Sequence, residues 1–509
     1  MTRIGDGDGV DAVVVGSGLG GLSAAAFLAA ANRKVVLVER AEKPGGSVRA
    51  VTRDGYVFDP AICHIPQGTE GELRDGLLAH LGVRELCELV PVDGTLYRVV
   101  LPGFDLRAPI GGEEIVAAHS SAFPREAKAI RQFFALCDQI LEDVHRLPLH
   151  LSFNDLGRAA ARFPTFFRYR TATLGDVLDD SFEDERLKAV AAASWPWAGL
   201  PPSRLSFSTC AQGLALLTRG VLVCRGSFQR LADAFTEAIE ARGGDVLLGR
   251  DVTRILVEDG RVLGVGLDDG TEIRAPVVIS NADARQTFET LVGAEQLPAP
   301  FVRRLAAMKP SISAFVLFAA TTLDLAALGA ARESFLYTSW DHDASYRDAV
   351  GGMPAAKWAS VPTLHDASLA PPGEHIVIVR ALAPFDLGAD WDAAAAPYAD
   401  LLMAELDAFF PGFRDHLTFV DWLTPRDLEA SSRTSQGALY GWESSPSATG
   451  SRRPAIVTSI AGLYLAGHWT QPGHGSYRTI LSGMHAARAV LAEDGDEALV
   501  PEFRVPADS

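Results

Sequence analysis

The fold of the N-terminal region is decided by residues 11–21, which read DAVVVGSGLGG. A β-branched run over 11–15 ends in glycines, a small-residue helix is expected over 22–31, and a second β-branched run covers 34–39. A strand, a helix and a strand in this order connect by a right-handed crossover, which makes the two strands parallel. The segment therefore predicts a βαβ unit with a glycine turn before its helix.

The glycines of this turn match the spacing G-x-G-x-x-G at Gly16, Gly18 and Gly21. The first permits the tight turn, the second lets backbone approach a pyrophosphate, and the third lets the helix pack closely on the strand. The N–H groups and the dipole at the helix start favour phosphate charge there. Glu39 ends the second strand, where an acid about 20 residues beyond the glycines meets ribose hydroxyls. The pattern predicts a dinucleotide site.

A second glycine turn, residues 44–47, follows Glu39 and favours FAD over NAD, because backbone can pass beside a flavin there. A short strand is expected over 55–59, which reads GYVFD. These two elements resemble the flavin amine oxidase superfamily, and more narrowly its phytoene desaturase and carotenoid isomerase-like branch. The resemblance implies an enzyme that binds FAD non-covalently.

The resemblance continues in a later hairpin and in a C-terminal glycine-rich segment. It implies that the backbone of Val252 addresses adenine and that Gly467 and His468 lie near the ribityl-phosphate. Two positions depart from the family pattern: His468 replaces an acid and Ala61 replaces a glycine. The predicted FAD-binding residues are Gly16, Ser17, Gly18, Leu19, Gly20, Gly21, Glu39, Arg40, Gly45, Gly46, Ser47, Val252, Gly467, His468, Tyr477, Arg478, Thr479 and Ile480.

The whole chain is expected to form an α/β fold. A Rossmann-type FAD-binding domain, like that of glutathione reductase, would combine with a discontinuous substrate domain of mixed sheet and helices. The predicted FAD domain comprises 1–75, 225–300 and 436–495, the substrate domain 76–224 and 301–435, and the C-terminal tail 496–509. Clear local patterns predict helices over 130–145, 226–242, 397–410 and 479–491, and strands over 252–258, 261–268, 277–280, 314–318, 376–381 and 462–466.

Composition excludes several classes of function. The 509 residues carry a formal net charge of -18, so the chain lacks the basic footprint that nucleic acids require. Five widely spaced cysteines without a CxxC pair predict neither a disulfide framework nor a metal site, and fit a cytoplasmic protein. We expect neither a secretory signal nor a membrane-spanning helix. Membrane contact is expected to be weak or absent, with peripheral association left open.

The expected chemistry is that of flavin oxidoreductases on apolar substrates, with desaturation or dehydrogenation as the leading interpretation. Three alternatives stay open: an isomerase or cyclase without net redox change, an amine oxidase, and a non-enzymatic FAD-stabilised binding protein. The candidate catalytic residues are His64, His474 and Tyr477, which can exchange protons beside a flavin. The absence of lysine after Lys357 disfavours a lysine-dependent amine oxidase. Aromatic residues available for an apolar pocket are Phe166, Phe167, Trp195, Trp197, Trp442 and Trp469.

Overall fold

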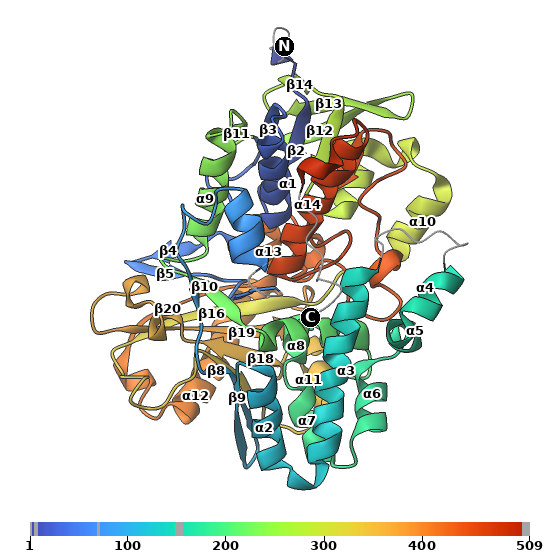
Figure 1. Ribbon diagram of the computed structural model, residues 1–509. Coiled ribbons are helices and arrows are strands. Elements are labelled where there is room, and N and C mark those ends of the chain that lie inside the picture. The colour runs from blue at the N-terminus through green and yellow to red at the C-terminus, as the bar shows by residue number, and fades with distance from the viewer. Residues whose placement is uncertain (1–2, 5–8, 69–71, 148–155, 501–509) are drawn as a thin grey trace.

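A five-stranded parallel sheet forms the upper part of the molecule in Figure 1. The computed structural model describes residues 3–4, 9–68, 72–147 and 156–500. The strand order is β11, β3, β2, β15 and β21, with bounds Asp245–Leu247, Val35–Val38, Ala12–Val15, Val277–Ser280 and Leu463–Leu465. All four pairings are parallel. Strands from both ends of the chain thus build one sheet.

Helix α1, Leu19–Ala30, follows β2 and is buried along almost its whole length. It begins before the predicted start at Leu22, because the last glycines of the turn already belong to its first turn. Helix α14, Ser476–Ala492, follows β21 and lies beside α1 (Figure 1). Helix α9, Gln229–Glu240, packs on the other side of α1 and leads into β11.

The contact between α1 and α14 is a backbone contact made possible by glycine. A Cβ on Gly483 would lie 2.7 Å from the amide nitrogen of Ala24 and closer still to the carbonyl oxygen of Gly20. Ser23 donates a hydrogen bond of 2.8 Å to the carbonyl of Ile480 across the same contact. At Gly483 the backbones of the two helices therefore touch directly.

A four-stranded sheet covers the outer side of this domain, with β12, β13 and β14 as an antiparallel meander. Their bounds are Val252–Glu258, Arg261–Leu267 and Glu272–Arg274, and β1, Arg3–Ile4, pairs with β14. The turn from β12 to β13 places Asp259 at φ +49° and Gly260 at φ +73°. This left-handed pair is the Asp-Gly turn chemistry that the sequence contains.

A seven-stranded mixed sheet forms the second half of the molecule, in the strand order β20, β16, β19, β18, β17, β8 and β9. Their bounds are Leu417–Leu423, Ser313–Thr321, His375–Ala383, Lys357–Ser360, Glu333–Leu336, Thr95–Leu101 and Phe104–Pro109. Helix α12, Trp391–Phe409, packs on one face and contains Pro397. The helical pattern predicted from this proline onward is therefore the later part of a longer helix.

A layer of helices lies beside the mixed sheet, at the lower right of Figure 1. It comprises α2 Gly112–Ala122, α3 Ala127–Arg146, α4 Leu156–Arg162, α5 Pro164–Tyr169, α6 Leu174–Ser181, α7 Glu185–Ala192 and α8 Phe207–Thr218. Helix α3 carries the predicted apolar face over 130–145 and packs against α8. Within the described ranges, no helix is both long and apolar enough to traverse a bilayer. The domain limits proposed above stay predictions.

We predict that Gly483→Ala destabilises the protein and lowers its FAD content. Alanine favours a helix by up to about 1 kcal/mol over glycine, but the added Cβ would force α14 away from α1, and such overpacking costs about 1–3 kcal/mol. The thermal midpoint, followed by release of flavin fluorescence, should fall. Gly112→Ala is the matched control, since this helical glycine is exposed and its Cβ meets nothing within 4 Å. Equal midpoints for the two variants would contradict the packing argument.

Candidate active site

The main cavity of the molecule runs from the first glycine turn to the start of α14. Its volume is about 390 Å³, and its lining comes from both ends of the chain and from the helical layer. At the first end, Gly16 has φ +90° and Gly18 immediately precedes α1. A Cβ on Gly46 would lie 3.0 Å from Cα of Gly18, so the two glycine turns pack against each other. This backbone cradle fits the pyrophosphate of a dinucleotide.

Glu39 reaches back from the end of β3 to the first glycine turn. Its Oε2 accepts hydrogen bonds from the backbone N–H and the hydroxyl of Ser17, at 2.9 Å and 2.7 Å. Its Oε1 accepts one from the N–H of Ala41 at 2.9 Å. Oε1 keeps acceptor capacity for a second hydrogen bond, so the side chain lies ready for a ribose hydroxyl.

The C-terminal glycine loop at Gly467 and the first glycine turn both lie against the side chain of Asn281. Asn281 follows β15, and a Cβ on Gly18 would lie 2.6 Å from its Nδ2. A Cβ on Gly20 would lie 2.6 Å from its Oδ1 and 2.5 Å from the backbone nitrogen of Gly467. The N–H of Gly467 donates to the hydroxyl of Ser482 at 2.7 Å. Residues hundreds of positions apart thus share one wall of the cavity.

The far end of the cavity is an apolar space, which we call the aromatic chamber. Its walls come from the turn after α7, from α8 and the stretch before it, and from the segment before β21. They comprise Trp195, Trp197, Leu205, Leu214, Leu217 and Tyr440. Arg478 lies at its edge on the first turn of α14, and its Nη2 donates to the carbonyl of Thr209 at 3.4 Å. Burial lowers the pKa of Arg478 to about 10. Among the described residues, no carboxylate forms an ion pair with this cation.

Several buried donors around this end of the cavity have no protein partner among the described residues. They are Trp195 Nε1, Trp197 Nε1, His468 Nε2, Trp469 Nε1 and His474 Nε2. Buried polar groups are paired in most native structures, so donors of this kind indicate a polar ligand or water. Together with the glycine cradle and Glu39, they fit an FAD that extends from the first glycine turn to the start of α14.

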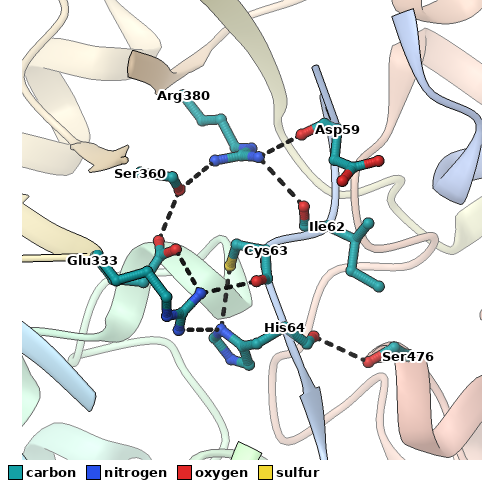
Figure 2. A network of polar contacts seen from close by, with 9 residues as sticks. Asp59, Ile62, Cys63, His64, Glu333, Ser360, Arg380 and Ser476 are labelled. Atoms are coloured by element: carbon teal, nitrogen blue, oxygen red, sulfur yellow. Dashed lines mark hydrogen bonds and ion pairs between the residues drawn. The ribbon is translucent and has the colours of Figure 1, made fainter. Parts of the chain in front are cut away.

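Residues 59–64 form the floor of the chamber, and we call them the pinned loop. Arg380 of β19 donates to the carbonyl of Pro60 at 2.6 Å and to the hydroxyl of Ser360 at 2.7 Å. Figure 2 shows its hydrogen bonds to Ser360 and to the carbonyl of Ile62. Ser360 donates in turn to Glu333 at 2.7 Å. Arg332 donates to the carbonyl of Cys63 at 2.8 Å. Two buried guanidinium groups thus hold a loop between β5, Tyr56–Phe58, and β6, Ile65–Pro66.

The surroundings of the cavity histidines favour the neutral ring. Burial, together with Arg332 and Arg380, holds the pKa of His64 well below its usual value. Burial and Arg453 lower the pKa of His468 to about 4, and burial also lowers that of His474 well below the usual range. These rings can therefore donate and accept hydrogen bonds without carrying charge near pH 7.

Cys63, His64 and Glu333 bring three potential metal-ligating atoms within 4.8 Å of one another. Arg332 forms an ion pair of 2.9 Å with Glu333, and Arg380 lies next to the same cluster. A metal cation in this place would face two guanidinium charges in a buried environment, which is costly. The cluster is therefore better suited to hydrogen bonding than to metal binding.

The structure brings most of the predicted site residues to this cavity. The three candidate catalytic residues line it, as do all predicted FAD-binding residues except Gly21 and Ile480. A Cβ on Gly21 would clash with the carbonyl of Gly16, and the carbonyl of Ile480 accepts from Ser23, so both serve helix packing. Tyr477 donates to Glu72 at 2.9 Å. Their roles in binding and catalysis stay predictions.

The aromatic residues predicted for the pocket divide into two groups. Trp195, Trp197 and Trp469 line the cavity. Trp442 is fully buried in the core and donates to the carbonyl of Trp469 at 3.0 Å. The two phenylalanines 166–167 belong to α5, outside the cavity lining.

Three residues of this site, Asn281, Arg332 and Arg380, were not predicted from the sequence. Arg380 interrupts the apolar strand 376–383, and a single cation in such a run signals a buried partner. Asn281 follows the carboxyl end of a parallel strand, where ligand-binding side chains gather in open α/β sheets. Both signals are present in the sequence, although neither identifies the partner.

Comparisons with known proteins agree with this geometry. A family model described as flavin containing amine oxidoreductase matches residues 19–491. Hydroxyneurosporene desaturase of Rhodobacter capsulatus is 29% identical, with 95% of this chain and 98% of that protein covered. Prolycopene isomerase of Arabidopsis thaliana is 26% identical, with 96% and 83% covered. The mouse pyridine nucleotide-disulfide oxidoreductase domain-containing protein 2 is 28% identical, with 95% and 93% covered.

Solved structures share the fold at lower identity. An oxidoreductase from Methanosarcina mazei superposes with a TM-score of 0.64 at 19% identity, covering 93% of this chain and 99% of that one. Cyclohexylamine oxidase from Brevibacterium oxydans superposes with a TM-score of 0.64 at 16% identity, covering 95% and 99%. These similarities confirm the predicted α/β fold class and bear on the fold alone.

We predict that Glu39→Ala weakens FAD binding about 10- to 100-fold, because each hydrogen bond to a charged group contributes about 1.5–3 kcal/mol. Reconstitution of the apoprotein with FAD, followed by flavin fluorescence, measures the dissociation constant. Glu240→Ala is the control, since this exposed glutamate ends α9 and lies outside the cavity. Unchanged affinity in Glu39→Ala would show that this carboxylate does not bind the ribose.

Proposed function

Because the chain belongs to the flavin-containing amine oxidoreductase family, we propose that it desaturates or dehydrogenates a small, hydrophobic, unsaturated molecule. The comparisons confirm that it is a flavin-dependent oxidoreductase with FAD as cofactor. Bound FAD supplies the two-electron transfer. The chain's own residues bind the substrate, exclude water and place hydrogen-bond donors beside the reacting bond.

The aromatic chamber is the observation that carries this proposal. It is continuous with the FAD end of the cavity, and among the described residues of its walls none is a carboxylate. Apolar walls favour an apolar substrate, since burial of hydrocarbon surface contributes about 25 cal/mol per Å². The edge-to-face contact of Trp197 with Phe335, at 4.8 Å between ring centroids, keeps the wall rigid.

We propose a substrate of the size of a small terpenoid, with a ring or a short unsaturated chain, and β-ionone serves as its probe.

The charge of the chamber disfavours amine oxidation. Arg478 lies at the edge of the chamber. A protonated amine would meet this cation without a neighbouring carboxylate in the described part of the walls. Cyclohexylamine should therefore leave the flavin oxidised under anaerobic conditions. Bleaching of the flavin by this amine would favour the amine oxidase alternative.

Isomerisation without net redox change is the second candidate, because prolycopene isomerases are among the relatives. Anaerobic incubation of the holoenzyme with β-ionone distinguishes the two. Dehydrogenation bleaches the flavin in proportion to product, whereas an isomerase forms product and leaves flavin absorbance unchanged at the end. A protein that binds FAD and alters no unsaturated probe would be a binding protein instead.

Partners and location are part of the proposal. The net charge of -18 argues against nucleic acid and anionic membranes, so a dissolved small molecule is the expected partner in the cytoplasm. Flotation with neutral and anionic liposomes checks this. Protein that stays wholly with the vesicles in high salt would contradict it.

We predict that Leu214→Trp blocks the substrate and preserves FAD. Leu214 faces the chamber from α8, and a larger ring there would occupy the space of the substrate. β-Ionone should bind the wild type at least about tenfold more tightly than the variant, which corresponds to about 1.4 kcal/mol of binding free energy. The change in flavin absorbance on binding measures both affinities. Leu328→Trp is the control, since Leu328 is 46% exposed and outside the cavity. Equal affinity in all three proteins would place the substrate elsewhere.

A further inference from the structure

His64 occupies a position in which one ring nitrogen is held by the protein and the other is left for a ligand. Its Nδ1 lies 3.3 Å from Nη2 of Arg332 and 3.2 Å from Sγ of Cys63. Its ring packs edge-on against Trp197, at 4.9 Å between centroids. Figure 2 shows Cys63 and His64 side by side in the pinned loop, with Glu333 nearby.

From these contacts we infer that His64 is a neutral hydrogen-bond donor, which binds an oxygen atom of the substrate through Nε2–H. The inference rests on the proposed function and narrows its substrate class. An oxygen conjugated with the unsaturation, as in an enone, is the group that such a donor recognises. A pure hydrocarbon offers it no acceptor.

The protonation of the ring follows from the chemistry of its neighbour. A guanidinium group has five N–H donors and no acceptor, and it does not lose its proton in proteins. The contact between Arg332 and Nδ1 is therefore attractive only when Nδ1 is an unprotonated acceptor. In a neutral imidazole the proton then resides on Nε2.

Arg332 is held firmly enough to impose this state. One nitrogen of its guanidinium group donates both to the carbonyl of Cys63, at 2.8 Å, and to Glu333, at 2.9 Å. The side chains of Arg332 and Glu333 are 3% and 1% exposed, respectively. Burial and the two neighbouring guanidinium groups also disfavour an imidazolium. Arg332 is thus a positioning residue for His64.

By elimination, the second nitrogen of His64 faces the cavity. Nε2 forms no hydrogen bond with any described residue, and it is not fully enclosed by protein atoms. Because His64 lines the main cavity, this atom is exposed to that cavity. A neutral imidazole N–H can polarise a carbonyl oxygen in a protein site, as a histidine does in triosephosphate isomerase. With Nδ1 occupied and Nε2 protonated, His64 has no free lone pair and is not a general base.

Nitrogen NMR of the holoenzyme, labelled with ¹⁵N-histidine, tests the protonation state. His64 is assigned by the loss of its signals in His64→Gln. We expect a protonated Nε2 and an unprotonated Nδ1 at pH 7 in the wild type, a mixture of tautomers in Arg332→Met, and restoration in Arg332→Lys. A protonated Nδ1 in the wild type would overturn the inference. A structural role of Arg332 alone would not change the tautomer.

The affinities of two probes test the proposed hydrogen bond from His64 to an oxygen atom of the substrate. β-Ionone is compared with the hydrocarbon in which its ketone oxygen is replaced by two hydrogens, and flavin absorbance reports both. We expect the holoenzyme to bind the ketone about five- to tenfold more tightly, since one neutral hydrogen bond contributes about 1 kcal/mol. His64→Phe should abolish this ratio, and His64→Gln, which keeps an N–H donor, should retain part of it.

Three results would overturn the inference in distinguishable ways. Equal affinity of the wild type for ketone and hydrocarbon would overturn the oxygen contact and leave the proposed function intact. A shift of the flavin reduction potential in substrate-free His64→Phe, with an unchanged binding ratio, would assign the donor to the flavin. Binding of neither probe by the FAD-loaded wild type would overturn the proposed function as well.

Discussion

The close contact of α1 with α14 is the constraint on which the rest of the structure depends. It exists because Gly483 has no side chain, so that its backbone lies directly against the backbone of Gly20 and Ala24. The same contact brings the loop of Gly467 against the first glycine turn, so that one cofactor can touch both. Because backbone meets backbone, the distance between the two parts of the FAD site tolerates little variation. The ends of the chain are thus joined by packing at the site where the flavin binds.

The second half of the site depends on buried charge. Arg380 and Arg332 extend from the mixed sheet and bind backbone carbonyls of the pinned loop. Buried guanidinium groups are costly unless their donors are satisfied, and here loop carbonyls, Ser360 and Glu333 satisfy most of them. The loop therefore has a fixed conformation, and the mixed sheet determines where His64 lies.

How far the sequence predicts these features depends on the range of the interactions involved. The strands over 252–258 and 277–280 have the predicted bounds, because alternation and turn residues are local signals. The glycine turns are equally local. The carbonyl of Pro60, which accepts a hydrogen bond from Arg380, lies 320 positions away in the chain, and no periodicity encodes that distance. The chamber could not be derived either, because α8 contributes its wall only after the helical layer has packed. Buried cations within apolar runs are the one sequence signal that points to such partners.

The order of strands in the parallel sheet has a consequence for synthesis of the protein. Strand β2 is made first, but its neighbour β15 ends at Ser280, and the last strand begins at Leu463. The βαβ unit therefore emerges from the ribosome long before α14, the helix that packs against α1, has been synthesised. During that interval the nascent chain exposes an apolar helix face and an unpaired strand edge, which chaperones recognise and which promote aggregation. Premature termination before residue 476 would remove α14, the helix that packs against α1.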